Sequence, residues 1–414
     1  MLLARFLKPL VKVGTLTVID ADGRPHMFAG DPGPSVTMRI HSKALQRRYF
    51  FQPSMATGEG YMEGQLTVED GGTIYDLLDL ACMNMGHKRA VTPFHALTRQ
   101  AARLFRRVQQ FNPISRAQTN VAHHYDLSGA LYDLFLDSDR QYSCAYFEPG
   151  VDDLESAQYE KKRHIAAKLL LEPGMRVLEI GSGWGGLALS LARETGACVT
   201  GLTLSQEQLK VSRERAKRAG LADRVEFHLR DYREETGIYD RIVSVGMFEH
   251  VGINHFGQYF AQVRDRLKPD GIALLHTIGR AEGPGATDPW IRKYIFPGGY
   301  IPALSEMARP IEDSGLWIAD IEVLRLHYAK TLRHWRERFV ANWDRAKALY
   351  DERFCRMWEF YLAASEASFR HLGNVVFQVQ LANRQDAVPL TRDYIGNAHR
   401  RLKREQTPDR TQAA

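Results

Sequence analysis

Cysteine is scarce in this chain of 414 residues. The four cysteines are isolated from one another, at Cys82, Cys144, Cys198 and Cys355. Cysteines spaced in this way form neither a zinc motif nor a disulfide framework, and they are typical of a reducing compartment. We therefore expect a cytoplasmic protein without a metal site.

Long apolar runs are also missing. Hydrophobic residues make up 44% of the chain and charged residues 25%, which is ordinary for a globular protein. No uninterrupted stretch approaches the roughly 20 apolar residues that span a bilayer. Arg5 and Lys8 interrupt the first ten residues, so no signal peptide is expected there. The length favours two domains over one compact core.

Acidic residues are absent between Asp79 and Asp126, although the net charge of the whole chain is only +6. Within this stretch, residues 95–111 are predicted to form an amphipathic helix with a basic side. Each basic residue near an anionic leaflet contributes on the order of 1 kcal/mol, so the helix is expected to bind lipid reversibly. The alternative is a solvated helix that joins two domains. No nucleic-acid recognition motif accompanies these charges, and no nucleic-acid partner is expected.

The N-terminal part predicts a small α/β unit. Strands are expected at 15–20, 35–40 and 60–69, turns at 22–25 and 31–34, and a helix from about Thr73. Proline after the basic helix places a domain boundary near 111–115. The expected organisation is therefore an N-terminal domain over 1–115, a second domain over 116–395 and a polar tail over 396–414 that frays from Arg400.

A glycine-rich loop follows a predicted buried strand at 175–180. The loop is Gly-Ser-Gly-Trp-Gly-Gly at 181–186, and a helix is predicted directly after it. Glycines here let the backbone approach a ligand closely. The spacing also fits a dinucleotide loop, but the next strand ends at Thr203 without the acidic residue that would hold a ribose, which argues against NAD. A glycine turn that serves only helix packing is a further alternative.

Two later strands carry polar residues at their predicted carboxyl ends. Glu249 follows the strand that begins at Arg241, and His276 is expected just past the end of the strand that begins at Gly271. Ligands of open α/β sheets bind outside the carboxyl ends of the strands, so an active site is predicted here. The alternatives are a first-turn acid that favours the helix dipole, for Glu249, and a hydrogen-bonded core histidine, for His276.

After Gly279 the alternation of strands and helices stops. We expect residues 280–372, with a helix over 331–356, to form a helical insertion that covers a ligand and sets substrate choice.

Eight sequence blocks follow one another between residues 124 and 299. They are His124–Ser128, Tyr142–Phe147, the glycine loop, Gly201–Gln208, Asp231–Tyr232, Phe248–Gly252, His276–Gly279 and Pro289–Gly299. Together they resemble the cyclopropane-fatty-acid-phospholipid synthases, which are class I S-adenosylmethionine-dependent methyltransferases. The resemblance implies an α/β fold with a Rossmann-like, mostly parallel sheet, a helical lid insertion, and a smaller N-terminal domain associated with the membrane and with dimer formation.

The same resemblance implies a reaction. The methyl group of S-adenosylmethionine would be transferred to the cis double bond of an unsaturated phospholipid acyl chain, and bound bicarbonate would remove a proton to close a cyclopropane ring. The protein would be a homodimer bound peripherally to the inner face of the membrane. The alternatives are a related methyltransferase that yields a methyl- or methylene-branched chain or methylates a small amine, and a non-catalytic lipid-binding protein with the same fold.

Site residues carried over from the family fall into two groups. The bicarbonate ligands would be Cys144, Glu249, His276, the backbone at Ile278, and Tyr328. The cofactor would contact Tyr142, Ser143, Val177, Glu179, Gly181, Ser182, Gly183, Trp184, Gly185, Thr203, Leu204, Ser205, Gln208, Asp231 and Tyr232. The aromatic candidates for stabilising a carbocation are Tyr146, Phe147, Phe248, Tyr294 and Phe296.

Three positions depart from the family pattern. Glu179 stands where aspartate is usual, Ser182 where cysteine is common, and Ser365 where family members commonly carry a cysteine that has been regarded as catalytic. A thiol nucleophile is therefore absent at 365. The reaction described above passes through no covalent enzyme intermediate, so we interpret the change as tolerated.

Overall fold

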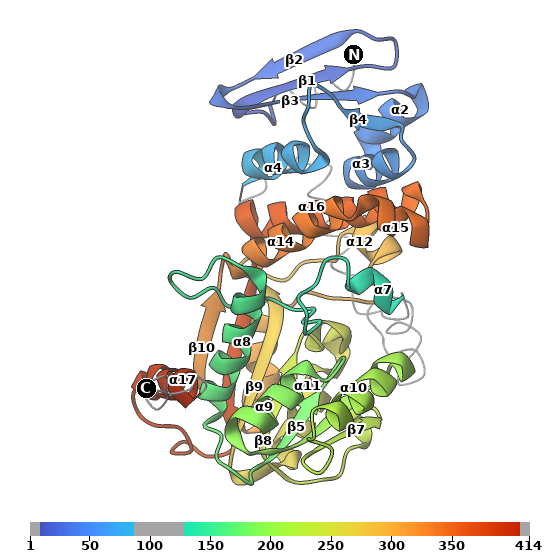
Figure 1. Ribbon diagram of the computed structural model, residues 1–414. Coiled ribbons are helices and arrows are strands. Elements are labelled where there is room, and N and C mark those ends of the chain that lie inside the picture. The colour runs from blue at the N-terminus through green and yellow to red at the C-terminus, as the bar shows by residue number, and fades with distance from the viewer. Residues whose placement is uncertain (1–8, 87–127, 406–414) are drawn as a thin grey trace.

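The computed structural model describes residues 9–86 and 128–405, which form two sheets joined by a layer of helices (Figure 1). The smaller sheet has the strand order β2-β1-β3-β4, and the larger one the order β10-β11-β9-β8-β5-β6-β7. The predicted α/β class with a smaller N-terminal unit is confirmed. The predicted basic helix at 95–111 and the predicted boundary near 111–115 lie outside the described residues. Within the described ranges no helix is both long and apolar enough to cross a membrane.

The N-terminal sheet is covered on one face by three helices. Its strands are β1 (Val13–Ile19), β2 (Pro25–Ala29), β3 (Asp31–Ile40) and β4 (Leu66–Val68), and its helices are α2 (Lys43–Phe51), α3 (Pro53–Met62) and α4 (Ile74–Met85). Every second residue of β1 is buried, which is the period of a strand with one face on a core. The predicted start of α4 is correct, because Thr73 forms a capping box with Asp76.

Two predictions for this unit are wrong. Residues 31–34 belong to β3 instead of a turn, since Asp31 and Ser35 both pair with β1. Residues 60–62 end helix α3 instead of starting a strand, because Pro53 opens a helix whose buried positions include Gly58 and Gly60. Apolar residues at the end of α3 and at the start of β4 alternate across Gly64 as they would in one strand, which explains the wrong prediction.

The larger sheet has five neighbouring parallel strands and two further strands at one edge. They are β5 (Arg176–Ile180), β6 (Cys198–Thr203), β7 (Val225–Leu229), β8 (Tyr239–Val245), β9 (Leu267–Arg280), β10 (Trp317–Leu324) and β11 (Asn374–Ala382). Strand β11 runs antiparallel to both β9 and β10. Such a mostly parallel order places the carboxyl ends of β5, β6 and β8 at one edge of the sheet.

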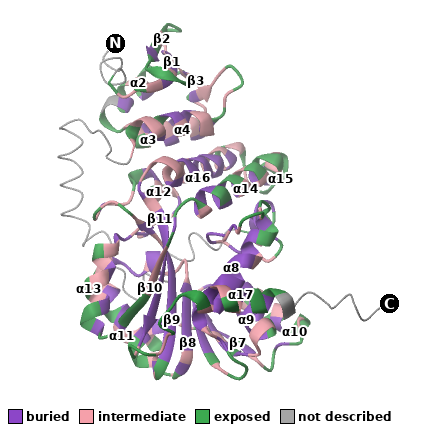
Figure 2. Ribbon diagram, turned by 90° about the vertical axis from the view of Figure 1, so that its left-hand side faces the viewer, coloured by how far each residue is buried: buried purple, intermediate pink, exposed green. Residues whose placement is uncertain are grey.

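Helices cover both faces of this sheet (Figure 2). One face packs on α8 (Leu154–Leu169), α9 (Gly186–Thr195), α10 (Gln206–Arg218) and α17 (Asp393–Glu405), and the other on α11 (Phe256–Arg266) and α13 (Leu304–Ser314). Side chains alternate between the two cores, with Val177 facing the first and Leu178 the second. A sheet buried on both faces accounts for the almost continuous apolar strands in the sequence.

The segment predicted as a helical insertion, 280–372, differs from that expectation. It contains β10, which pairs with β11 and extends the sheet, as well as the helices α12 (Pro289–Tyr294), α14 (His327–Ala341), α15 (Trp343–Leu349) and α16 (Glu352–His371). The single helix predicted over 331–356 is wrong. The helical conformation is interrupted at Asn342 and again at Asp351. The Asp351 side chain accepts from Phe354 N and caps the start of α16.

Helix α16 joins the N-terminal unit to the rest of the molecule. Helices α3 and α4 pack on it, and one continuous apolar core runs from the N-terminal sheet into this layer. The Tyr61 hydroxyl donates to Glu359 at 2.5 Å, and His371 lies 2.8 Å from Asp79. Trp290 of α12 fills the space beside Gly58 of α3.

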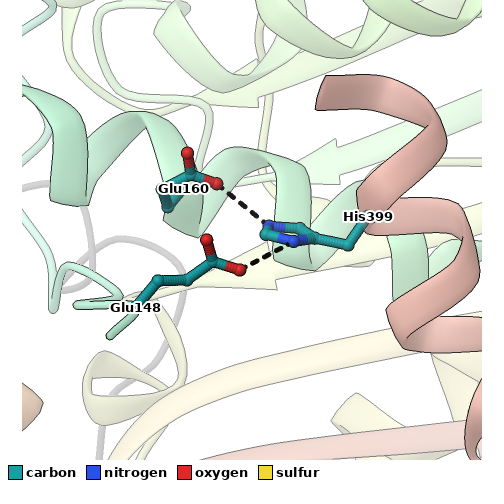
Figure 3. Close-up of side chains that lie close together, drawn as sticks. All are labelled: Glu148, Glu160 and His399. Atoms are coloured by element: carbon teal, nitrogen blue, oxygen red, sulfur yellow. Dashed lines mark ion pairs between the residues drawn. The ribbon is translucent and has the colours of Figure 1, made fainter. Parts of the chain in front are cut away.

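The C-terminal helix α17 is attached to α8 by an ionic cluster (Figure 3). Its His399 lies between two carboxylates, with Nδ1 2.8 Å from Glu148 and Nε2 3.0 Å from Glu160. Arg163 donates to Glu160 at 2.8 Å, and Lys403 contacts both carboxylates. The prediction that the tail frays from Arg400 is wrong as far as residue 405, because the ionic cluster and the buried Leu402 hold the helix in place.

Candidate functional site

A cavity opens at the carboxyl ends of β5, β6 and β8, beneath the glycine loop. Twelve of the residues that the resemblance assigns to the cofactor line it: Tyr142, Ser143, Glu179, Gly181, Ser182, Gly183, Trp184, Thr203, Leu204, Gln208, Asp231 and Tyr232. Residues from several of the sequence blocks therefore lie together around one cavity.

Three residues of the same set lie away from the cavity wall. Val177 is the second residue of β5 and belongs to the core shared with α9. Gly185 has a φ of +81°, and a Cβ there would lie 2.6 Å from the Phe227 ring, so this glycine serves close packing. The Ser205 side chain accepts from Gln208 N and caps α10.

Other wall residues were missed by the sequence reasoning. They are Arg140, Gln141, Gly186, Leu187, Leu202, Arg230, Arg233, Val245, Gly246, Met247, His250 and Val251. Most of them adjoin the predicted residues in sequence or end the same strands. The position of each strand end was the available signal, and applying it to β8 would have found Val245 to Met247.

Asp231 stands at the end of β7, where a ligand's polar groups could be held. Its two carboxylate oxygens accept from Arg233 Nε at 2.8 Å and from an Arg233 terminal nitrogen at 2.6 Å. Such a bidentate pair fixes the plane of the carboxylate. Asp231 is thus held rigidly on the wall together with the adjoining Tyr232.

Glu249 lies in the short 3₁₀ helix η2 (Phe248–His250) that follows β8. Its Oε1 accepts from the backbone N–H of Ile278 at 2.6 Å, so the structure joins these two candidate residues directly. The other oxygen, Oε2, is buried without a hydrogen-bond partner among the described residues. Burial raises the pKa of Glu249 from its usual value to about 7.

His276 lies within β9, and the prediction that it follows the strand is wrong. Strand β9 continues to Arg280 because its pairing with β11 continues to Asn374. The ring is buried, and Gln378 Nε2 lies 3.1 Å from its Nδ1. Burial, with a smaller contribution from the charge of Lys161, lowers the pKa of His276 to about 3, so the imidazole is neutral. With the amide nitrogen facing Nδ1, the ring proton sits on Nε2.

Cys144 and Tyr328 complete the predicted set. The buried Cys144 Sγ donates to the Ala145 carbonyl at 3.3 Å, and burial raises the pKa of the thiol well above its usual value, so the group stays protonated. Tyr328 lies in the first turn of helix α14, and its ring packs against Trp335 and Phe369.

The aromatic candidates separate into different environments. Phe248 is fully buried and stacks on Phe256, which makes it a core residue. The Phe296 ring centroid lies 6.0 Å from that of His250, which lines the cavity. Ser365 lies in α16, where its carbonyl accepts from the Ser368 hydroxyl at 2.7 Å.

Comparisons with known proteins agree with this geometry. The family model described as mycolic acid cyclopropane synthetase matches residues 113–379. The cyclopropane-fatty-acyl-phospholipid synthase of Escherichia coli (strain K12) is 40% identical over 353 residues, which are 84% of this chain and 88% of that protein. The tuberculostearic acid methyltransferase UfaA1 of Mycobacterium tuberculosis is 36% identical, over 86% of this chain and 84% of that protein.

Among solved structures, the mycolic acid cyclopropane synthase CmaA1 complexed with SAH and CTAB superposes with a TM-score of 0.61 at 32% identity. The match covers 66% of this chain and 99% of that one. The family match and the relatives span the sheet and the cavity described above. The chain therefore belongs to the mycolic acid cyclopropane synthetase family of S-adenosylmethionine-dependent methyltransferases.

Proposed function

We propose that this protein transfers the methyl group of S-adenosylmethionine to the cis double bond of an unsaturated phospholipid acyl chain and closes a cyclopropane ring, with bound bicarbonate as the base. The 40% identity to a cyclopropane-fatty-acyl-phospholipid synthase over most of both chains supports the substrate class. The observation that carries the chemistry is the buried Oε2 of Glu249, which has no hydrogen-bond partner in the described part of the chain and which adjoins the wall residues His250 and Val251 in sequence.

The cavity fits S-adenosylmethionine. Gly181 and Gly183 have positive φ values, and the loop they form brings its backbone to the cavity wall. Asp231 and Glu179 add carboxyl groups, and Tyr142 and Trp184 add aromatic faces. When bound, this cofactor supplies a methyl group on a positively charged sulfur. Aromatic faces and carboxylates are the groups that stabilise such a cation.

The chain's own residues would orient the acyl chain and exclude water. An alkene is a poor nucleophile, so its alignment with the methyl group matters more than any side-chain proton transfer. The Tyr142 and Tyr361 hydroxyls lie 2.9 Å apart, and the Tyr142 ring packs against Trp335, so this side of the cavity is aromatic. Such a wall keeps water away from a reactive cation without offering it a nucleophile.

The fit of bicarbonate rests on polar groups that are buried but incompletely paired. Glu249 Oε2 is an available acceptor for an O–H group, and the neutral His276 carries its proton on Nε2. The resemblance adds the Tyr328 hydroxyl and the Cys144 thiol, whose proton would have to turn from the Ala145 carbonyl toward the anion. A weak base is sufficient here because a methyl group on a carbocation is a very strong acid.

The test uses the purified protein, S-adenosylmethionine and vesicles of unsaturated phospholipid. We expect each product acyl chain to gain one CH₂ without a reductant, and NMR to show cyclopropane ring protons. Removing carbonate from the buffer should lower turnover at least tenfold, and added bicarbonate should restore it. An unchanged rate in carbonate-free buffer would contradict the role of bicarbonate.

A second candidate function is methyl transfer that leaves a branched chain, because one relative is named as a tuberculostearic acid methyltransferase. In the same assay that product would carry a methyl or methylene branch and no ring. Association with the inner membrane surface and homodimer formation are part of the main proposal. Binding of the protein to the vesicles and its mass in solution test them.

A further inference from the structure

Helix α8 reaches the cavity from behind through two buried side chains, Gln158 and Lys161. Lys161 is completely buried, and its Nζ donates to Gln141 Oε1 at 2.7 Å and to Ser143 Oγ at 2.9 Å. One turn earlier, Gln158 Nε2 donates to the backbone carbonyls of Gln141 and Ser143 at 3.1 and 2.9 Å. Gln141 and Ser143 line the cavity. Helix α8 therefore sets the position of this part of the wall.

The direction of these hydrogen bonds is fixed by chemistry. An ammonium group only donates, so both of its partners must accept. At Gln141 the carbonyl oxygen is held by Lys161, which turns the amide nitrogen toward Asp139 Oδ2, 3.0 Å away. At Ser143 the oxygen accepts, and its own proton must point elsewhere. Because Ser143 lies on the cavity wall, its hydroxyl can donate into the cavity.

We propose that Lys161 is a positioning residue for the cofactor: it holds the Ser143 hydroxyl as a hydrogen-bond donor toward an acceptor oxygen of bound S-adenosylmethionine. The inference rests on the proposed function only in taking that molecule as the ligand. Lys161 acts through Ser143 and does not itself contact the cofactor.

The charge state of Lys161 makes the arrangement sensitive to pH. Burial lowers the pKa of Lys161 to about 8, against the opposing effect of the Asp137 and Asp139 carboxylates, and the neighbouring charge of Lys162 lowers it further. Below this pH the ammonium can only donate. Above it, the neutral amine has a lone pair that can accept the Ser143 proton and turn the hydroxyl away from the cavity. Affinity for the cofactor should therefore fall as the pH rises through about 8.

Three other titratable groups lie near Lys161. The Cys144 thiol stays protonated and the His276 ring stays neutral throughout this range, because burial moves both pKa values out of it. Glu179 changes its protonation state within this range, since burial raises the pKa of this wall residue to about 8. A pH profile of the unaltered protein alone would mix the two effects, so it must be compared with that of a variant that lacks the Ser143 hydroxyl.

The experiment measures S-adenosylmethionine affinity by calorimetry between about pH 6.5 and pH 9. The proteins are the unaltered chain, Ser143→Ala, Lys161→Met and the double variant. We expect each single change to weaken binding about tenfold at pH 7, the double variant to be no weaker than Lys161→Met, and the alkaline loss to shrink in all three variants. Additive losses, or an alkaline loss in Ser143→Ala equal to that of the unaltered protein, would overturn the proposal.

Lys168→Met is the matched control. Lys168 is equally buried on the same helix, but its Nζ donates to Glu322 at 2.5 Å instead of to the cavity wall. We expect its cofactor affinity to be unchanged. If Lys161→Met does not fold, the comparison of the unaltered protein with Ser143→Ala still decides the matter. Absence of cofactor binding by the unaltered protein would contradict the proposed function itself, whereas binding without these effects would contradict only the role of Lys161.

Discussion

At the scale of single residues, the site combines groups that are expensive to bury. Glu249 and Glu179 are both buried, each has one oxygen without a hydrogen-bond partner among the described residues, and burial raises the pKa of both. A buried carboxyl that is not fully paired destabilises the folded chain. Residues of this kind are kept where they serve a ligand, so stability and activity should respond in opposite directions when they are replaced.

Replacing Glu249 by glutamine tests this opposition. The pKa of Glu249 is about 7 in the folded chain against a usual 4.5, so the cost of ionising it begins above pH 4.5 and is complete above pH 7. Glutamine removes that cost. We expect Glu249→Gln to raise the free energy of unfolding by roughly 2–3 kcal/mol at pH 8 and hardly at all at pH 4, while turnover falls about 100-fold.

Denaturant titrations at the two pH values and a turnover assay measure these effects. Glu226→Gln, at an exposed carboxylate of β7, is the control and should change neither quantity. An equal stability difference at pH 4 and pH 8 would contradict the ionisation argument.

At the scale of elements, close packing depends on residues that look unremarkable in the sequence. Helix α3 approaches α12 because Gly58 has no side chain, and a Cβ there would lie 2.3 Å from the Trp290 indole nitrogen. Such contacts join segments far apart in the chain. No local pattern predicts them, since a glycine that packs against another helix and a glycine that faces open space look the same in the sequence.

Gly58→Ala should therefore destabilise the protein, although alanine is the better helix former. The added methyl group must displace a fully buried tryptophan, and we expect a loss of roughly 1–3 kcal/mol in the free energy of unfolding. Gly257→Ala in α11 is the matched control, because nothing lies near its missing Cβ, and it should cause no loss. Thermal unfolding of both variants measures the difference, and equal melting temperatures would refute the packing argument.

The sequence predicts an element well when residues near it in the chain determine its structure, and poorly when pairing with a distant segment does. The glycine loop, the strand directly before it and the start of α4 at Thr73 follow from neighbouring residues, and these predictions are confirmed. Strand β10 and the continuation of β9 past His276 exist because β11 pairs with both, and β11 comes much later in the chain. The wall residues found only in the structure, such as Gln141, owe their place to tertiary contacts with α8.

At the scale of the whole molecule, the C-terminal helix stabilises the site from a distance. Helix α17 packs on α8, and its His399 holds Glu160, which directly precedes Lys161. Burial would raise the pKa of Glu160, but the hydrogen bond from His399 and the charges of Arg163 and Lys403 bring it below its usual value. Stability from this cluster is therefore present above the ordinary range of a glutamate and is lost as the pH falls through the lowered pKa.

His399→Ala should loosen α17. We expect hydrogen exchange of the α17 amides to accelerate about tenfold at neutral pH, since the ring that lies between the Glu148 and Glu160 carboxylates is removed and its contacts with both are lost. Arg400→Ala, an exposed neighbour on the same helix, serves as the control and should exchange at the original rate. If α17 exchanges equally in the unaltered protein and in His399→Ala, the cluster does not hold the helix.

Helix α16 contacts both the cavity and the N-terminal unit. Its Tyr361 helps to build the aromatic side of the cavity, while its Glu359 and Phe360 meet Tyr61 of the N-terminal unit. A shortened protein without the N-terminal unit would therefore expose the apolar face of α16 to water. Such a minimal version would need that outer surface rewritten with polar side chains before it could be expected to remain dispersed at high concentration.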